Sequence, residues 1–285
     1  MPFTIQQINN QLKNKLKNVY SNAEIQQLLF LIYKKAANLS KIQVLTNYEM
    51  QIPEHNYNEI TDIANRLANN EPIDYIIGET EFFNLQFIVN PSVLIPRPET
   101  EELVHWVLTD YNKKQKILDI GTGSGCIAVS LAKNMQNAEV FAVDISKQAL
   151  ETAKKNAQNN GAKINFAECN ILNADYTLLP QGIDIIISNP PYVRQSEKTF
   201  IKPNVLDYEP ELALFVTDNN PIVFYKKIAL AGKKILNNNG LIFFEINEAL
   251  AKEVKNMLEE LQYSQIEIRK DINGKKRMVK AMLTQ

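Results

Sequence analysis

The sequence predicts an α/β protein with a mostly parallel sheet, preceded by a small helical domain. From residue 115 onward, short apolar runs such as KILDI and GIDIIIS alternate with helical segments, which is typical of parallel strands joined by helices. A glycine-rich loop, GTGSG, follows the first of these runs directly. The first third of the chain instead has apolar residues at helical spacing.

The helical region should contain four or five short helices. Ile5, Ile8 and Leu12 recur at the spacing of one helix face. A later helix is expected to begin at Asn56, because Asn56 and Glu59 have the spacing of an N-terminal capping signal. No set of residues typical of a catalytic site occurs in this region.

A β-hairpin should follow the helices. The stretch YIIGETEFFNLQFIVNPSVLIPRPET is dense in aromatic and β-branched residues, and Asn84 lies where a turn is expected. The tail, SQIEIRKDINGKKRMVKAML, has a turn signal between two apolar runs, so its two strands should be antiparallel. The predicted domains are a helical domain over residues 1–75, a hairpin linker over 76–98 and a sheet domain over 99–285.

Composition and charge exclude several classes of protein. The chain has 285 residues, is 45% hydrophobic and has a formal net charge of −1, so no strong overall field attracts nucleic acid or a membrane. Two cysteines and two histidines cannot build a disulfide framework or a zinc cluster, and no metal site is expected. The start of the sequence lacks the pattern of a signal peptide and no run suits a membrane span, so a cytoplasmic protein without membrane contact is expected.

The charge of the helical region is uneven. Residues 1–41 contain six lysines and one glutamate, whereas residues 42–75 contain one arginine and six acidic residues. Two solvated helical faces would explain this pattern. A surface that docks a partner is the less favoured alternative.

The glycine loop and two acidic residues predict a ligand site. Ligands of open parallel sheets bind beyond the carboxyl ends of the strands, where glycines let the backbone approach them. Asp119 lies just before the loop, opposes a pyrophosphate and suits an ammonium group, while Asp144 ends the next strand and can accept hydrogen bonds from a ribose. S-adenosylmethionine is a nucleoside with a positive end and no phosphates, and it fits this pattern; structural turns with solvated acids are the alternative.

The candidate cofactor-binding residues follow from this interpretation. Ile145 and Ile171 are placed to flank the adenine, and Asn170 can bond its edge, although isoleucines at such positions are often core residues. The complete set is Asp119, Gly121, Thr122, Gly123, Ser124, Gly125, Asp144, Ile145, Asn170, Ile171 and Asn189.

The motif NPPY ends the buried strand GIDIIIS, and it predicts the chemistry. Methyl transfer to a planar nitrogen needs acceptors for its two N–H groups, so that the nitrogen lone pair can develop toward the methyl. Asn189 offers a side-chain carbonyl and Pro190 a backbone carbonyl, and the two proline rings fix their positions. Tyr192 can stack on a flat amide or base. A proline-rich turn that only ends the strand is the alternative interpretation.

The chain resembles the class I methyltransferases that act on planar nitrogens, through the motifs LDIGTGSG, VFAVD and SNPPYV. Three further segments point to one family among these enzymes, namely EPIDYIIGETEF, LIPRPETEELV and DYEPELAL. From about Arg66 to the end, the chain is similar to the protein release factor glutamine N5-methyltransferases of the PrmC/HemK type. The resemblance implies a Rossmann-like, seven-stranded methyltransferase domain, with the helical domain recognising the substrate. It also implies S-adenosylmethionine as cofactor, S-adenosylhomocysteine as product, and the glutamine of the Gly-Gly-Gln motif of peptide chain release factors as the methylated group.

The same resemblance implies roles for particular residues. Asn189, Pro190 and Tyr192 would be catalytic, and the substrate-binding residues would be Asn189, Pro190, Pro191, Tyr192 and Glu209. The segment IPRPETE, which contains Arg97, Glu99, Thr100 and Glu101, would lie near the methionine end of the cofactor. The alternative interpretation is that this segment only begins a helix, with a threonine cap and acidic residues in the first turn.

Four rival functions remain open at this stage. NPPY also suits the exocyclic amine of adenine or guanine in a nucleic acid, but such enzymes need a basic face, and only residues 267–280, with six basic and two acidic residues, provide one. Methylation of a glutamine in a ribosomal protein is a further alternative function. A module that binds the cofactor without turnover and a NAD-dependent oxidoreductase fit less well, the latter because the loop reads GxGxG and not GxGxxG.

Overall fold

The computed structural model describes residues 3–111 and 115–284. Contacts divide the chain into two compact units. The first unit comprises Met1–Gly78 together with Lys202–Tyr208, and the second comprises Glu79–Ile201 together with Glu209–Gln285.

The first unit is a helical bundle. Its apolar faces form one core, to which Ile8, Ile32 and Ile63 contribute fully or almost fully buried side chains. A two-residue antiparallel pair, which the sequence did not predict, joins the chain before the first helix to the chain before the fourth. The elements are β1 (Phe3–Thr4), α1 (Ile5–Leu16), α2 (Asn22–Ala37), α3 (Lys41–Thr46), β2 (Gln51–Ile52), α4 (Glu54–Ala68) and α5 (Ile73–Ile77).

Local side chains cap the first helices of this unit, whereas α4 and α5 follow prolines. Ser21 with Glu24 and Ser40 with Gln43 form reciprocal capping boxes at α2 and α3. The predicted start of α4 at Asn56 was wrong, because α4 begins at Glu54 behind Pro53. The Asn56 amide instead donates to the carbonyl oxygen of Ala36 in the last turn of α2, so it satisfies a helix end and not a helix start.

A segment from late in the sequence completes the first unit. Residues 202–208 contain the short helix α9 (Pro203–Leu206) and belong to the helical unit by their contacts. The hydroxyl of Tyr208 donates to the carbonyl oxygen of Asn69 over 2.8 Å. The chain therefore leaves the second unit after Ile201 and returns to it at Glu209.

The second unit is built on a seven-stranded sheet with the strand order β12-β13-β11-β8-β5-β6-β7. The five strands from β11 to β7 are parallel, while β13 is antiparallel to both β11 and β12. This confirms the predicted fold class, including the antiparallel last pair. The strands are β5 (Lys116–Ile120), β6 (Glu139–Asp144), β7 (Ile164–Glu168), β8 (Ile183–Ser188), β11 (Leu236–Glu245), β12 (Tyr263–Lys270) and β13 (Lys276–Leu283).

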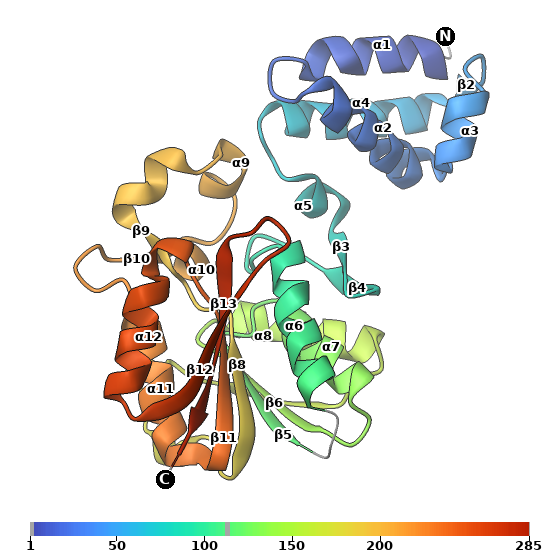
Figure 1. The fold of residues 1–285 in the computed structure, drawn as a ribbon. Helices are drawn as coiled ribbons and strands as arrows, with labels where there is room; N and C mark the ends of the chain where they lie inside the picture. Colours follow the sequence, from blue (N-terminus) through green and yellow to red (C-terminus); the bar gives the residue numbers. More distant parts are fainter. Residues whose placement is uncertain (1–2, 112–114, 285) are drawn as a thin grey trace. The chain divides into compact units, whose positions relative to one another are not determined.

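Helices cover both faces of this sheet (Figure 1). Leu118 and Ile186 point to one face and pack with α11 (Val223–Ile235) and α12 (Ala251–Glu260). Ile117 and Ile187, their neighbours along the strands, point to the other face and pack with α6 (Pro98–Asp110) and α7 (Cys126–Asn134). The central strands are buried on both faces, which explains their continuous apolar sequences.

The remaining elements are a hairpin, a helix that packs against β6 and β7, and short segments. The hairpin of β3 (Glu79–Phe82) and β4 (Leu85–Ile88) turns at Phe83 and Asn84, both with positive φ, as the sequence predicted for Asn84. By its contacts the hairpin belongs to the second unit. The others are α8 (Lys147–Asn159), β9 (Val193–Arg194), α10 (Glu211–Leu214) and β10 (Phe215–Val216).

Candidate active site

The glycine loop joins the end of β5 to the start of α7. Gly121, Gly123 and Gly125 all have positive φ, between 55° and 81°. A methyl group added at Gly121 or Gly123 would meet no atom within 4 Å, so open space lies beside these two backbones. At Gly125 it would lie 3.1 Å from the Cβ of Ala153 on α8. The first two glycines thus leave room for a ligand, and the third lets α8 pack closely.

Asp144 is the last residue of β6, and its carboxylate binds the backbone of the glycine loop. One carboxylate oxygen accepts from the backbone nitrogen of Gly123 over 2.8 Å, and the other accepts from the backbone nitrogen of Ser146 over 2.9 Å. Burial raises the pKa of the Asp144 carboxyl, and these backbone amides partly oppose the shift. Each oxygen keeps a further lone pair, so the loop contact leaves acceptor capacity for a ligand hydroxyl.

Asp119 lies at the end of β5, immediately before the loop, and its side chain is fully buried. Its carboxyl accepts a hydrogen bond from the Thr122 hydroxyl over 2.6 Å. Burial raises the pKa of Asp119 to about 7. Thr122 and Ser124 are buried as well, and the Ser124 carbonyl oxygen accepts from Asn156 of α8 over 2.8 Å.

Asn156 is a residue that sequence reasoning missed. It is fully buried, and its amide also pairs with both the backbone nitrogen and the carbonyl oxygen of Ile88 on β4. One side chain therefore ties the glycine loop to the hairpin. A polar residue on the apolar face of a helix was the available signal.

The three predicted adenine contacts have different environments. Ile145 follows β6 and is 42% exposed, so it can flank a ligand. Ile171 is 7% exposed and belongs to the core that contains α11 and α12. The Asn170 side-chain oxygen accepts from the backbone nitrogen of Leu172, which makes a local turn. Contacts of these side chains with adenine stay predictions.

The NPPY motif follows β8, whose neighbours are β5 and β11. The Ser188 hydroxyl donates to the carbonyl oxygen of Ile120 over 2.6 Å and joins the carboxyl ends of β8 and β5. NPPY therefore begins beside the glycine loop. Asn189, Pro191 and Tyr192 are half-buried, and Pro190 is buried.

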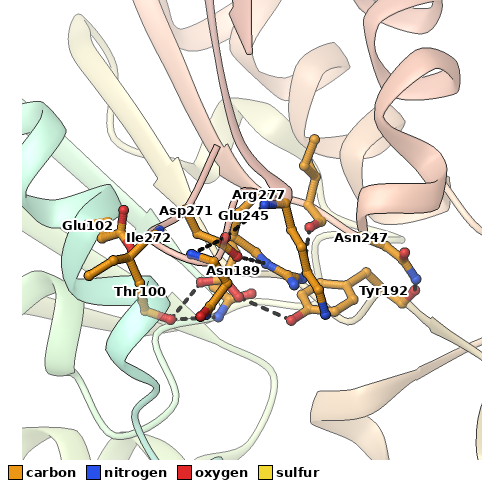
Figure 2. A network of polar contacts seen from close by, with 12 residues as sticks. Thr100, Glu102, Asn189, Tyr192, Glu245, Asn247, Asp271, Ile272 and Arg277 are labelled. Atoms are coloured by element: carbon orange, nitrogen blue, oxygen red, sulfur yellow. Dashed lines mark hydrogen bonds and ion pairs between the residues drawn. The ribbon is translucent and has the colours of Figure 1, made fainter. Parts of the chain in front are cut away.

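A buried polar network holds Asn189 and Tyr192 (Figure 2). The Asn189 amide nitrogen donates to the Thr100 hydroxyl oxygen over 3.2 Å, and the Thr100 hydroxyl donates to Glu245 over 2.6 Å. The Tyr192 hydroxyl donates to the other Glu245 oxygen over 3.1 Å. Glu245 is 1% exposed and ends β11. The sequence analysis missed Glu245, although an acidic residue at the end of the apolar run GLIFF was a signal for it.

The segment IPRPETE forms the start of α6, with Arg97 as N-cap residue and Pro98 in the first turn. Glu99 and Glu101 lie in the first turn as predicted. The predicted threonine cap was wrong, because Thr100 lies inside the helix and its hydroxyl reaches Glu245 instead.

Glu209 lies just after the segment that belongs to the first unit, and its side chain is 1% exposed. Its carboxylate forms an ion pair with Arg97 and accepts from the backbone nitrogen of Ile95 over 3.2 Å. The geometry thus gives Glu209 a role in holding the chain before α6. Direct contact with a substrate stays a prediction for this residue.

A surface hollow of about 570 Å³ lies elsewhere, beside Val140 and Ile164 at the amino ends of β6 and β7. Apart from Glu209, the predicted site residues instead follow the carboxyl ends of β5, β6, β7 and β8, where ligands of such sheets bind. No helix in the described part of the chain is long and apolar enough to cross a membrane.

Comparisons with known proteins agree with this arrangement. Residues 7–78 match the PrmC N-terminal domain family, and residues 100–208 match the methyltransferase small domain family. The fold resembles the crystal structure of a methyltransferase from Pyrococcus furiosus, with a TM-score of 0.54 and 19% identity, over 79% of this chain and all of that one.

Curated relatives match almost the whole chain. It is 44% identical to a release factor glutamine methyltransferase of Flavobacterium psychrophilum, over 97% of this chain and 98% of the relative. It is 42% identical to one of Bacteroides thetaiotaomicron, over 95% of this chain and 97% of the relative. The chain belongs to the release factor glutamine methyltransferase family, as its motifs predicted.

Proposed function

We propose that the chain transfers a methyl group from S-adenosylmethionine to the side-chain amide nitrogen, N5, of the glutamine in the Gly-Gly-Gln motif of peptide chain release factors. The observation that carries this proposal is the position of Asn189. It follows β8 next to the glycine loop that follows β5, in a chain 44% identical to a curated enzyme of this name.

The residues around the glycine loop fit S-adenosylmethionine. The open space beside Gly121 and Gly123 accommodates a ligand close to the backbone. Asp144 has acceptor capacity for the ribose hydroxyls, and Asp119 is the acid available for the ammonium group. When bound, the cofactor would supply an electrophilic methyl group and would leave as S-adenosylhomocysteine. The substrate amide nitrogen would gain the methyl group and lose one proton to water.

Asn189 and Pro190 prepare the amide nitrogen for this attack. The Asn189 carbonyl oxygen accepts one N–H of the substrate amide, and the Pro190 carbonyl oxygen accepts the other. Both acceptors are fixed before the substrate arrives, Pro190 by its ring and burial and Asn189 by Thr100. Preorganised acceptors of this kind need no rearrangement during the reaction. Tyr192 packs on the flat amide, with its hydroxyl held by Glu245.

The helical unit is proposed to recognise the release factor. Every predicted cofactor residue lies in the second unit, so the helical unit is available for another task. Four apolar side chains on α3 and the turn after it are exposed by 42–72%, namely Ile42, Leu45, Tyr48 and Met50. An apolar docking surface for a protein partner would explain them.

Substitution of this surface tests the recognition role. Ile42→Ser combined with Tyr48→Ser should raise KM for the full-length release factor, while the affinity for S-adenosylhomocysteine and the rate with a short Gly-Gly-Gln peptide stay unchanged. Leu178→Ser, at an apolar position of the second unit that is 84% exposed, is the control. Unchanged kinetics of the double variant with the full-length factor would assign the patch another role.

Ion pairs of three of the six basic tail residues favour the release factor over a nucleic-acid substrate. The basic tail was the one feature in its favour, but Arg277 pairs with Asp271, and Arg269 and Lys280 both pair with Asp110 and Glu267. Arg269 also stacks over the Trp106 ring at 4.0 Å. The charges of these three residues are thus balanced within the protein.

Mass spectrometry tests the proposed reaction. Purified release factor should gain one methyl group on its Gly-Gly-Gln peptide after incubation with the enzyme and S-adenosylmethionine, and a factor with that glutamine changed to alanine should gain none. Methylation of duplex DNA or of a ribosomal protein in place of the release factor would contradict the proposal. Since the substrate is a protein of translation termination, the proposal includes a cytoplasmic location, which cell fractionation tests.

A further inference from the structure

The buried carboxylate of Glu245 has no assigned part in the reaction, although it contacts two side chains of the site. We propose that Glu245, acting through the hydroxyl of Thr100, is a positioning residue that determines which end of the Asn189 side-chain amide faces the substrate. This inference rests on the proposed role of Asn189 as acceptor for the substrate amide.

The number of protons in the network fixes its direction. A threonine hydroxyl has one proton to donate and otherwise only accepts. The Thr100 hydroxyl lies 2.6 Å from a Glu245 oxygen, the short distance of a hydrogen bond to a carboxylate, so its proton is directed there. Toward Asn189, 3.2 Å away, Thr100 then presents lone pairs, and only the Asn189 amide nitrogen can pair with them.

The orientation of Asn189 follows from this. With its nitrogen bonded to Thr100, the Asn189 carbonyl oxygen points away from that hydroxyl and is the end left for a substrate N–H. A reversed amide would place two acceptor oxygens together without a proton between them. Such a pair is unfavourable, because Thr100 is 2% exposed and its oxygen is shielded from water.

Groups from several elements surround Glu245. The Tyr192 hydroxyl donates to its second oxygen over 3.1 Å, and the Tyr225 hydroxyl of α11 donates to its backbone carbonyl oxygen, also over 3.1 Å. Arg277 of β13 adds a positive charge nearby, and Glu99 of α6 adds a negative one. Figure 2 shows how Glu245 lies between Thr100 and Tyr192.

Protonation of Glu245 would reverse the direction of the network. Burial raises the pKa of Glu245, while the bonds from Thr100 and Tyr192 and the charge of Arg277 oppose the shift. A protonated Glu245 can donate to Thr100, which leaves the Thr100 proton free for the Asn189 oxygen. That oxygen would then compete poorly for the substrate, so turnover should fall on acidification.

Three variants separate positioning from simple stabilisation. Thr100→Val keeps the shape but removes the hydroxyl, and kcat for a Gly-Gly-Gln peptide should fall roughly 10-fold, with the affinity for S-adenosylhomocysteine unchanged. Thr100→Ser restores the hydroxyl and should recover most of kcat. The glutamine in Glu245→Gln does not titrate, so the decline of kcat on acidification that is expected for the wild type should disappear in this variant.

A measurement without turnover gives an independent readout. The side-chain amide resonances of Asn189, identified by their loss in Asn189→Ala, should shift with pH in the wild type and stay constant in Glu245→Gln. An acidic decline of kcat in Glu245→Gln equal to that of the wild type would overturn the positioning role. So would wild-type turnover by Thr100→Val; if that variant fails to fold, the Glu245→Gln profile decides. A wild-type enzyme that leaves the peptide unmethylated would instead overturn the proposed function.

Discussion

The carboxylate of Asp144 lies 2.8 Å from the backbone nitrogen of Gly123 and accepts its hydrogen bond. The end of β6 thus determines the shape of the loop that follows β5. The same carboxylate is the predicted partner of the cofactor ribose, so one side chain has both a local structural role and a proposed ligand role.

Substitution of Asp144 should weaken binding of S-adenosylmethionine. Asp144→Ala removes a charged acceptor, and such a hydrogen bond contributes about 1.5–3 kcal/mol, or roughly 10- to 150-fold in affinity. Calorimetry measures the change. To separate the two roles, a 2′-deoxy analogue of S-adenosylhomocysteine should bind more weakly than the parent compound in the wild type, but equally in Asp144→Ala. Equal binding of both compounds by the wild type would place the ribose elsewhere.

Substitution of Asn189 should slow methyl transfer without preventing cofactor binding. Asn189→Ala removes one of two preorganised acceptors, and by analogy with the loss of one oxyanion-hole donor kcat should fall by about 10²–10³. Asn189→Asp keeps an acceptor but adds a negative charge beside the cofactor sulfonium, so it should bind the cofactor well and also react slowly. Turnover of folded Asn189→Ala within a few-fold of the wild type would refute the role of this residue.

Gly125 and Gly274 form a matched pair for testing the close packing of α8. Their φ values are +81° and +79°, so an alanine is similarly strained at both. At Gly125 the new methyl group would also lie 3.1 Å from the Cβ of Ala153, whereas at Gly274 it meets no atom within 4 Å. Gly125→Ala should therefore lower the free energy of unfolding more than Gly274→Ala, by about 1–3 kcal/mol. Equal losses in urea unfolding would show that α8 shifts freely.

Asp119 should make the stability of the cofactor-free enzyme depend on pH. Burial raises the pKa of its carboxyl to about 7, against about 4 for an aspartate in an unfolded chain. Between these pH values the folded state binds a proton that the unfolded chain has lost, so stability falls as pH rises from about 4 to about 7. Asp119→Asn should reduce this decline but not abolish it, because burial also raises the pKa values of Asp144 and Glu245. Urea unfolding across this range measures it, and an unchanged slope would contradict the prediction.

The sequence predicted those features that depend on local pattern. Buried strands such as Ile183–Ser188, the glycine loop and the turn at Asn84 were all readable, because periodicity and turn chemistry act over a few residues. Glu245 was not readable as a partner of Thr100, since 145 positions separate them and only the packing of α6 against β11 brings them together. The predicted helix start at Asn56 was wrong for a related reason, because the Asn56 side chain makes a tertiary contact to Ala36 and does not cap its own helix.

The assignment of residues 202–208 to the helical unit has a consequence for synthesis on the ribosome. When residue 78 leaves the exit tunnel, the helices are present but the segment that bears Tyr208 is not. The helical unit can reach its final form only after most of the sheet domain has been made, including β8 and NPPY. Because the helical unit is completed only by residues 202–208, the chain passes between the two units three times. The enzyme therefore cannot be divided by one cut into two intact units.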